Sequence, residues 1–322
     1  MVQAPRVSVI IPTCGRPEWL LECVESILRN DFTNFEILVV DQDPTQSLKT
    51  ELSKKFNDDP RIVYLFLDEA ALDKARNMGI EHACGEILVF ADDDVEVRPG
   101  WLRAYVDAFT RIQPPPGVVG GRLDPLWLSP KPEWLPEERE YLLGIYNKGN
   151  ELMPMSEGDL PIGANFAVLR QTVDKIGKFD ERIDYSYARR TSMISGGDSL
   201  FSLKVKQANS SVYYQPQARA WHKISKNKLT PKYFLKRNFW EGVTIVAVLY
   251  LSDSVTLTSC PGIIFWHMRE IGRQIWHAIF PKNKSWENLT HPKARMRLAA
   301  ACAYSLGAIY ASVKLLWTRR LP

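Results

Sequence analysis

Four short apolar runs, separated by segments with helical spacing, limit the fold of this 322-residue chain more than any other feature. The runs are rich in Val, Ile and Leu and cover residues 7–11, 36–40, 61–66 and 87–90. Between them we expect helices over residues 17–28, 48–56 and 73–83, the last capped by Asp73. Apolar strands that alternate with helices predict a parallel sheet covered on both faces, so the expected fold class is α/β.

Polar residues follow the carboxyl ends of these runs. Pro12 and Thr13 follow the first run, Asp41 follows the second, and three consecutive aspartates follow the fourth at residues 92–94. Ligands of open α/β sheets bind beyond these strand ends, so we expect the polar residues to face one site. Three adjacent carboxylates repel one another, and a divalent cation that prefers oxygen ligands, Mg²⁺ or Mn²⁺, relieves this repulsion. The alternative interpretation is a solvated acidic turn that caps the next helix.

Several classes of protein are excluded or disfavoured by what the sequence lacks. It contains neither Gly-x-Gly-x-x-Gly nor Gly-x-x-x-x-Gly-Lys-Ser/Thr, which argues against a dinucleotide-dependent dehydrogenase and a P-loop enzyme. The five cysteines are scattered without a Cys-x-x-Cys pair, which favours reduced thiols over a disulfide framework or a zinc site. The first residues, MVQAPRV, do not resemble a secretory signal. We therefore expect a cytoplasmic protein.

The composition of the chain changes after residue 112. Residues 113–159 are rich in Pro and Trp and predict a long loop, in which Trp127 and Trp134 either stack on sugars or anchor the loop. A short strand at 166–169, a helix at 171–176 and a polar loop at 185–194 are expected next. Asp198 then stands where it would cap a helix, and a strand at 212–215 and His222 complete the main body.

An ordered set of motifs extends over residues 7–222. Its members are VSVIIPTCGRP, EILVVDQD, ARNMG, ILVFADDD, GANFAVLR, KFDERI, GGDSLFSLKVKQA and the final WH. In this order they resemble family 2 glycosyltransferases, the inverting enzymes of the GT-A fold that use nucleotide-sugar donors. The resemblance implies a GT-A sheet, mostly parallel and sandwiched by helices. It also implies a nucleoside-diphosphate sugar, perhaps a UDP-sugar, as donor.

The resemblance also implies roles for individual residues. The residues expected to bind the nucleotide sugar are Pro12, Thr13, Arg16, Asp41, Arg76, Asp92, Asp93 and Asn165. Within this set Asp92 would contact the ribose, and Asn165 would contact sugar hydroxyls. Asp94 and His222 would hold Mn²⁺ or Mg²⁺ against the diphosphate. Asp198 would be the catalytic base that takes the proton of the acceptor hydroxyl.

Three departures from the family pattern are visible. Gly197 precedes the expected base, where the family commonly has an acidic residue. The second strand ends in Asp41-Gln42-Asp43-Pro44, where Asp-Asp-Gly-Ser is frequent, so the role of Asp43 is open. The Gln-x-x-Arg-Trp motif of processive synthases is absent, which predicts transfer of a single sugar per encounter.

The C-terminal part differs from the rest in charge. Residues 1–218 carry a net charge of −9, and residues 219–322 carry +13. Basic residues there alternate with Trp and Ile, at Arg269, Arg273, Lys282, Lys284, Arg295 and Arg297. Residues 298–317 are apolar and Ala-rich but contain Lys314, so a packed or interfacial helix is favoured over a span. Two interpretations stay open: a helical extension that packs on the catalytic domain, and residues 260–322 lying on an anionic membrane surface.

We therefore predict a catalytic domain over residues 1–222 and a basic, Trp-rich helical extension over 223–322. The nucleotide-sugar half would cover residues 1–112, and the acceptor half 113–222. The acceptor would be a glycan or a lipid-linked molecule of cell-envelope or exopolysaccharide synthesis, used in the cytoplasm or at the inner face of the plasma membrane. A sugar nucleotidyltransferase and a non-catalytic sugar-nucleotide-binding scaffold are the alternatives. We do not expect nucleic acid as a partner, because no recognition module is apparent.

Overall fold

The computed structural model describes residues 4–184, 192–279 and 291–322, and the chain divides into two compact units. The first, here called the sheet unit, contains Met1–Leu126, Tyr146–Arg190 and Gly197–Lys223. The second, the helical unit, contains Trp127–Ile145, Thr191–Gly196 and Ile224–Pro322. Two segments expected in the catalytic domain therefore group with the C-terminal part of the chain.

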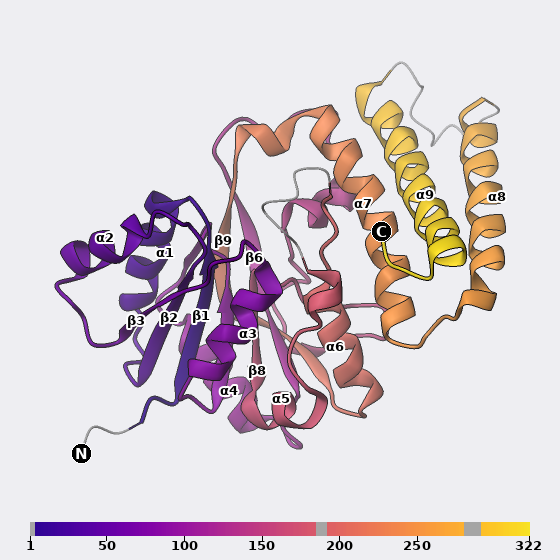
Figure 1. Cartoon of the computed structure of the whole chain (residues 1–322). Coiled ribbons are helices and arrows are strands. Elements are labelled where there is room, and N and C mark those ends of the chain that lie inside the picture. The colour runs from indigo at the N-terminus through magenta and orange to yellow at the C-terminus, as the bar shows by residue number, and fades with distance from the viewer. Residues whose placement is uncertain (1–3, 185–191, 280–290) are drawn as a thin grey trace. The chain divides into compact units, whose positions relative to one another are not determined.

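The sheet unit is built on a nine-stranded sheet (Figure 1). The order of its main path is β3-β2-β1-β4-β8-β6-β9-β5, and β7 pairs with β9. Its strands are β1 (Val7–Thr13), β2 (Phe35–Asp41), β3 (Ile62–Phe66), β4 (Ile87–Ala91), β5 (Val95–Val97), β6 (Val118–Trp127), β7 (Met153–Pro154), β8 (Asn165–Leu169) and β9 (Val212–Ile224). The first four strands are parallel, as the apolar runs predict, and antiparallel pairing begins at β8. The α/β fold class is confirmed.

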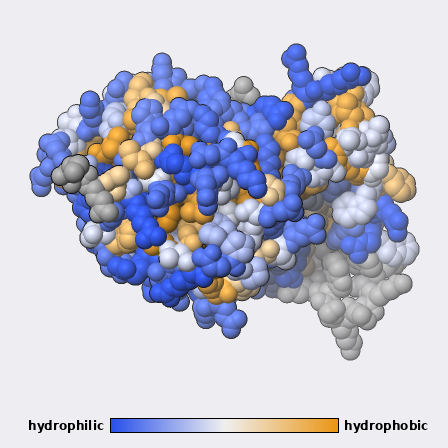
Figure 2. All heavy atoms as spheres, turned by 90° about the horizontal axis from the view of Figure 1, so that it is seen from below, coloured by the Kyte–Doolittle hydropathy of each residue, from blue (hydrophilic) through white to orange (hydrophobic). Residues whose placement is uncertain are grey.

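Helices cover both faces of this sheet because the side chains of each strand alternate between two cores. On β1, Val9 and Ile11 belong to one apolar cluster and Ile10 to the other. The first cluster is closed by α1 (Pro17–Leu28), α2 (Ser47–Phe56) and α4 (Trp101–Arg111). The second is closed by α3 (Leu72–His82), α5 (Arg170–Ile176) and α6 (Gly197–Gln207). The surface drawn in Figure 2 is mainly hydrophilic, with hydrophobic residues in small groups.

The predicted loop over residues 113–159 is partly a strand. β6 begins at Val118 and pairs antiparallel with β8, where Val118 lies opposite Val168. Two glycines and a proline in this segment weaken the local strand pattern, and the tertiary pairing overrides it. The segment also contains a 3₁₀ helix, Glu137–Leu143, which belongs to the helical unit. Most of the polar loop expected at 185–194 lies outside the described residues.

The helical unit consists mainly of α7 (Pro231–Leu251), α8 (Cys260–Ile279) and α9 (Pro292–Thr318). Shorter 3₁₀ turns lie at Lys226–Leu229 and Leu257–Ser259. Its core joins Leu135 and Leu143 to Phe234 of α7 and Ala300 of α9. The segment around Trp134 therefore packs within this unit, and the Trp134 ring lies 5.6 Å from that of Phe234. This contact supports the anchoring interpretation of Trp134.

Two glycines bring the backbones of α7 and α9 into contact. A Cβ atom on Gly242 would lie 1.9 Å from the carbonyl oxygen of Tyr304. One on Gly307 would lie 1.8 Å from the carbonyl oxygen of Phe239. The helices therefore pack more closely at this crossing than any larger residue allows. His267 of α8 contacts another side of α9 through Ser305, at 3.2 Å.

We expect Gly242→Ala to destabilise the helical unit, although alanine is the better helix former. Overpacking at the crossing costs about 1–3 kcal/mol, which exceeds the gain of about 1 kcal/mol in helix propensity. Thermal unfolding followed by circular dichroism measures the difference. The matched control is Gly272→Ala on α8, where an added Cβ meets no atom within 4 Å and stability should be unchanged or slightly higher. Equal effects of the two substitutions would contradict the close crossing.

Candidate active site

The carboxyl ends of the parallel strands bring the predicted polar residues together within the sheet unit. In the pairing of β1 with β2, Thr13 lies directly opposite Asp41, and Pro12 lies opposite Val40. Thr13 also reaches the aspartates after β4, because its hydroxyl donates to Asp93 Oδ2 at 2.7 Å. The three strand ends therefore form one continuous edge, as the sequence predicts.

Arg16, just before α1, contacts two of the three consecutive aspartates. Its guanidinium lies 2.6 Å from Asp93 Oδ1 and 3.1 Å from Asp94 Oδ2. Asp93 is fully buried, and this burial raises the pKa of Asp93 to about 7 although Arg16 opposes the shift. Burial likewise raises the pKa of Asp92, which is about one third exposed. The cluster would therefore gain from additional positive charge.

Asp94 and His222 converge on one point from neighbouring segments. β5 follows the aspartates and pairs antiparallel with β9, so that Val95 lies opposite His222. This pairing sets His222 Nε2 3.1 Å from Asp94 Oδ1, with both side chains buried. A backbone bond from Lys223 N to Asp94 O, 2.9 Å long, holds the same turn.

This pair fits a divalent cation that a ligand helps to hold. A carboxylate oxygen and an imidazole nitrogen within hydrogen-bonding distance can turn to the same ion; the oxygen suits Mn²⁺ or Mg²⁺, and the nitrogen suits a transition metal. In the part of the chain that the structure describes, no group of three or more His, Cys, Asp or Glu side chains forms a complete metal site. The remaining ligands would have to come from a bound molecule with oxygen donors and from water.

Asp41 lies at the far side of this edge and is held by its neighbours. Tyr64 donates its hydroxyl proton to Asp41 Oδ2 at 2.9 Å, and the Asp43 backbone donates to Oδ1 at 3.0 Å. Burial raises the pKa of Asp41, and these hydrogen bonds oppose the rise. Gln42 is tied to the first strand by donating to Thr13 O at 3.3 Å. Asp43 Oδ1 accepts from Thr45 N at 2.9 Å and thereby orders the turn after β2.

Arg76 projects from α3 and is almost completely buried. It pairs with Asp73 at 3.0 Å and approaches Asp92 Oδ1 to 3.7 Å. Its guanidinium also lies 5.4 Å from the Phe179 ring centroid, which supports its planar group from one side. The structure thus brings Arg76 to the aspartate cluster, as the sequence predicts.

Asp198 lies in the first turn of α6 and is one residue inside the helix, not at the cap. Its Oδ2 accepts from Gly163 N at 2.6 Å, and its Oδ1 accepts from Ser199 N at 2.9 Å. The side chain is half-buried, so it has access to solvent or to a ligand. Arg76 donates to the carbonyl of the same Gly163 at 3.2 Å, which connects Asp198 to the strand-end cluster.

Asn165 is placed differently from the prediction. Its Oδ1 accepts from Trp101 Nε1 and from the Tyr105 hydroxyl, each at 2.7 Å. Its Nδ2 donates to the carbonyls of Arg122 and Ala218, each at 2.9 Å. With every polar position used and 1% exposure, the amide joins α4 to the sheet and has no capacity left for a sugar hydroxyl.

Two residues of the site were not assigned a role from the sequence. Asp73 pairs with Arg76. The sequence predicts Asp73 as the cap of α3, but Asp184 caps this helix instead, because it accepts from the backbone N–H groups of Asp73 and Lys74. Gly163 supplies both backbone groups between Arg76 and Asp198. The Asp73-to-Arg76 spacing of three residues on a helix is a signal that could have identified the first.

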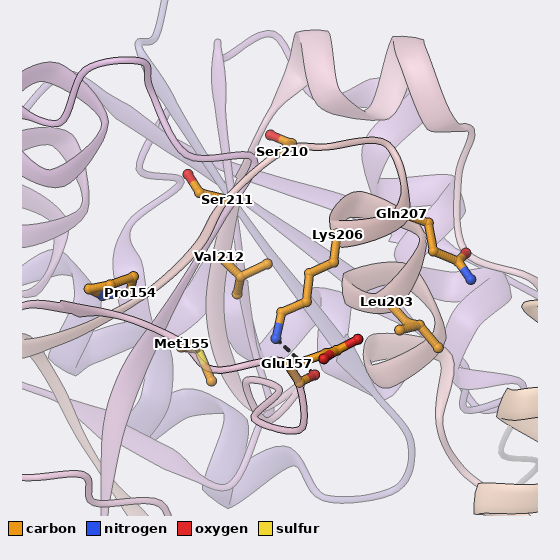
Figure 3. A pocket seen from close by; sticks show the side chains of 9 residues that line it. All are labelled: Pro154, Met155, Glu157, Leu203, Lys206, Gln207, Ser210, Ser211 and Val212. Atoms are coloured by element: carbon orange, nitrogen blue, oxygen red, sulfur yellow. Dashed lines mark hydrogen bonds between the residues drawn. The ribbon is translucent and has the colours of Figure 1, made fainter. Parts of the chain in front are cut away.

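A separate cavity of about 380 Å³ lies at the other end of α6 (Figure 3). Helix geometry puts Lys206 roughly 12 Å from Asp198 along the axis. The Lys206 ammonium donates to the backbone carbonyls of Ser156, Glu157 and Asp159, so it closes a loop. The other lining side chains include Met155, Leu203 and Val212, and nothing in this arrangement suggests a diphosphate site.

The comparison with protein families decides the identity of the sheet unit. The sequence matches the family described as "Glycosyl transferase family 2" over residues 8–177, which is more than half of the chain. The chain belongs to glycosyl transferase family 2. The region of the match contains β1 to β4, the aspartate cluster, Arg76 and Gly163, so the family rests on the part of the site built by the parallel strands.

This family 2 glycosyltransferase is similar to proteins with assigned reactions. The glucosyl-dolichyl phosphate glucuronosyltransferase of Haloferax volcanii is 26% identical over 251 residues, which are 76% of this chain and 78% of that protein. The GalNAc(5)-diNAcBac-PP-undecaprenol beta-1,3-glucosyltransferase of Campylobacter jejuni is 36% identical over 101 residues, 30% of this chain and 32% of that one. Both relatives are glycosyltransferases, as this chain is.

A solved structure confirms the GT-A fold of this glycosyltransferase. The mannosyltransferase PcManGT from Pyrobaculum calidifontis, solved with GDP-Man and Mn²⁺, matches with a TM-score of 0.56. The match covers 97% of this chain and 75% of that one. At 16% sequence identity the likeness establishes the fold alone.

Proposed function

We propose that the chain is a metal-dependent inverting glycosyltransferase that moves one sugar from a nucleoside-diphosphate sugar, a UDP-sugar, to a glycan or lipid-linked acceptor of cell-envelope synthesis. The observation that carries the proposal is the connection of Asp198 to the strand-end aspartates through Gly163 and Arg76. A base and a diphosphate site must lie close together for transfer, because the acceptor oxygen attacks the carbon next to the leaving diphosphate.

The donor would lie along the edge formed by β1, β2 and β4. Thr13 and Asp41, each 1% exposed, would form the floor of the nucleoside site, and Asp92 has part of its side chain exposed. Arg16 and Arg76 are planar, permanently charged donors suited to diphosphate oxygens. Asp94 and His222 would hold the divalent ion, which when bound neutralises negative charge on the departing diphosphate.

The displacement assigns one task to Asp198. The acceptor hydroxyl oxygen forms a bond to the anomeric carbon, and its proton passes to the Asp198 carboxylate. The bond between that carbon and the diphosphate oxygen breaks, and its electron pair leaves with the nucleoside diphosphate. A single displacement from the opposite face inverts the configuration. The names of the two relatives, which carry dolichyl phosphate and PP-undecaprenol, support a lipid-linked acceptor for this chain.

Replacing the base tests this proposal. We expect Asp198→Asn to lower turnover about 10²–10⁴-fold, because the amide cannot take the proton. Binding of UDP with Mn²⁺ should remain within about threefold of wild type, because Asp198 takes the proton of the acceptor and does not hold the diphosphate. Donor panels read by nucleoside diphosphate release measure the first quantity, and calorimetry measures the second.

The matched control for this substitution is Asp59→Asn, in the turn before β3. Asp59 pairs with Arg61 of the same turn at 2.7 Å, so its loss should leave turnover unchanged. The panel includes UDP-, GDP- and dTDP-sugars, so that three nucleobases are compared. Undiminished turnover of Asp198→Asn would overturn the base assignment.

We also propose that the helical unit lies on an anionic membrane surface. On α9, Leu306, Tyr310, Val313 and Trp317 recur at spacings of four, three and four residues and are all exposed, Trp317 to 86%. The opposite face of α9 consists of small residues packed on α7. An exposed apolar stripe of this kind on a soluble surface marks an interaction site.

The neighbouring helix α8 has the same character. Phe265, Trp266 and Trp276 are each more than half exposed, and the exposed Arg269 and Arg273 lie among them. Length and composition also make Pro292–Thr318 the one candidate membrane span within the described part of the chain. Its small-residue face packs against α7, and α8 carries arginines within its apolar face. Both features favour helices that lie in the interface over helices that cross it.

The basic residues divide into two groups. Arg297 pairs with Glu138 at 2.7 Å and Lys293 lies 3.5 Å from Glu137, so these two serve contacts within the helical unit. Exposed Arg319 and Arg320 follow the apolar stripe of α9 directly. Lys282 and Lys284 lie outside the described residues. Arg273 pairs with Glu270 at 2.7 Å, so Arg269 of α8 and the arginines after α9 would face lipid phosphates.

Vesicle co-sedimentation tests the membrane proposal. We expect binding to phosphatidylcholine vesicles only when they contain about one third phosphatidylglycerol, and we expect added salt to weaken it. Phe265→Ser/Trp317→Ser should reduce binding at least tenfold, because burying each large apolar side chain contributes about 1.5–3 kcal/mol. Leu152→Ser, at an exposed apolar residue of the sheet unit, is the control and should have no effect. A concentration-dependent dimer without vesicle binding would contradict the proposal.

A further inference from the structure

A buried carboxylate next to the proposed base has no part in the reaction described above. Asp73, in the first turn of α3, is 2% exposed and accepts from Arg76 Nη1 at 3.0 Å. Burial raises the pKa of Asp73 to about 7; Arg76 opposes the shift, and the carboxylates of Asp184 and Asp198 add to it. Keeping an acid in this position is unfavourable unless its contacts offset the lost hydration.

Asp73 fills the space in front of Gly197, the residue that directly precedes the base. A Cβ atom on Gly197 would lie 1.9 Å from Asp73 Oδ2 and 2.4 Å from Asp73 Cγ. Atoms that are not bonded to each other do not approach so closely. The carboxylate of Asp73 therefore occupies the space that a side chain at residue 197 would need, although the two residues are far apart in the sequence.

The same carboxylate begins a polar chain that ends on the base. Asp73 holds Arg76, Arg76 donates to Gly163 O at 3.2 Å, and Gly163 N donates to Asp198 Oδ2 at 2.6 Å. Gly163 has no room for a side chain, since its Cβ would lie 2.6 Å from Arg76 Nη2 and 2.8 Å from Asp198 Oδ2. Gly163 thus fixes Asp198 through its N–H group, and Arg76 fixes the carbonyl group of the same residue.

We propose that Asp73 is a positioning residue for the base. Its carboxylate occupies the space of a side chain at residue 197. From there it fixes the positions of Arg76 and Gly163, and thereby the orientation of Asp198. The inference rests on the proposed function, because Asp198 takes a proton only in the transfer reaction. A positioning role acts on the proton-taking step and leaves the donor bound. Because Arg76 also lies at the donor edge, loss of the Asp73 charge lowers kcat and raises the donor KM by a smaller factor.

Two substitutions test the charge and the space separately. Asp73→Asn keeps the shape and one acceptor for Arg76, and it should lower kcat about tenfold or more while the donor KM rises by a smaller factor. Gly197→Ala should do the same, because the new Cβ displaces the carboxylate. Gly100→Ala is the control for the second substitution, since a Cβ on Gly100 meets no atom within 4 Å and kcat should not change.

A relocation of the carboxylate gives the sharpest test. Because a Cβ on residue 197 would lie 2.4 Å from Asp73 Cγ, Asp73→Gly/Gly197→Asp puts a carboxylate back near the same space from the other side. We expect this double variant to recover at least tenfold in kcat over Asp73→Gly alone, and Asp73→Gly/Gly197→Asn to recover none. The comparison of the two double variants holds even where a single variant fails to fold.

The outcomes separate this inference from the proposed function. Active wild type with an unchanged kcat for Asp73→Asn, or equal recovery by the Asp and Asn double variants, would overturn the positioning role alone. A wild-type chain that transfers no sugar from any donor of the panel, though it is folded by circular dichroism, would overturn the proposed function and this inference with it. Recovery by the relocated carboxylate alone supports both.

Discussion

Negative charge collected at the ends of parallel strands is the physical condition on which the rest of the sheet unit depends. Asp92, Asp93 and Asp94 leave a buried strand together, and the guanidinium of Arg16 contacts two of them. The raised pKa of Asp93 shows that this contact does not fully offset the loss of hydration. A site of this kind is stabilised by binding more positive charge, and a cation brought with a diphosphate meets that need.

The same condition explains the arrangement around Asp198. Arg76 is shared between Asp73 and Asp92, so one buried cation serves both the donor edge and the start of α6. Glycines occur where this sharing requires backbone and side chains to approach closely, at residues 163 and 197. The geometry of the base and the charge of the donor edge are therefore coupled through a single guanidinium.

The parallel strands and the polar residues at their ends could be predicted from the sequence, because a strand buried on both faces consists of an uninterrupted run of apolar residues. β6 could not, since its glycines and proline remove the local pattern and its pairing with β8 is decided at long range. Asn165 shows a second limit. A polar residue at a strand end suggests a ligand contact, but its partners Trp101 and Tyr105 come from α4, some sixty residues earlier. The contact between Asp73 and Gly197 also joins residues far apart in the sequence, so no local spacing pattern predicts it.

The most direct measurement for the central claim is a calorimetric titration of UDP into the full chain, with and without Mn²⁺, for wild type and Asp94→Ala. We expect Mn²⁺ to strengthen UDP binding to wild type at least tenfold and to have no effect on Asp94→Ala, because Asp94 and His222, which lie 3.1 Å apart, would hold the ion. UDP binding to wild type that does not depend on Mn²⁺, or a metal effect that survives in Asp94→Ala, would contradict it.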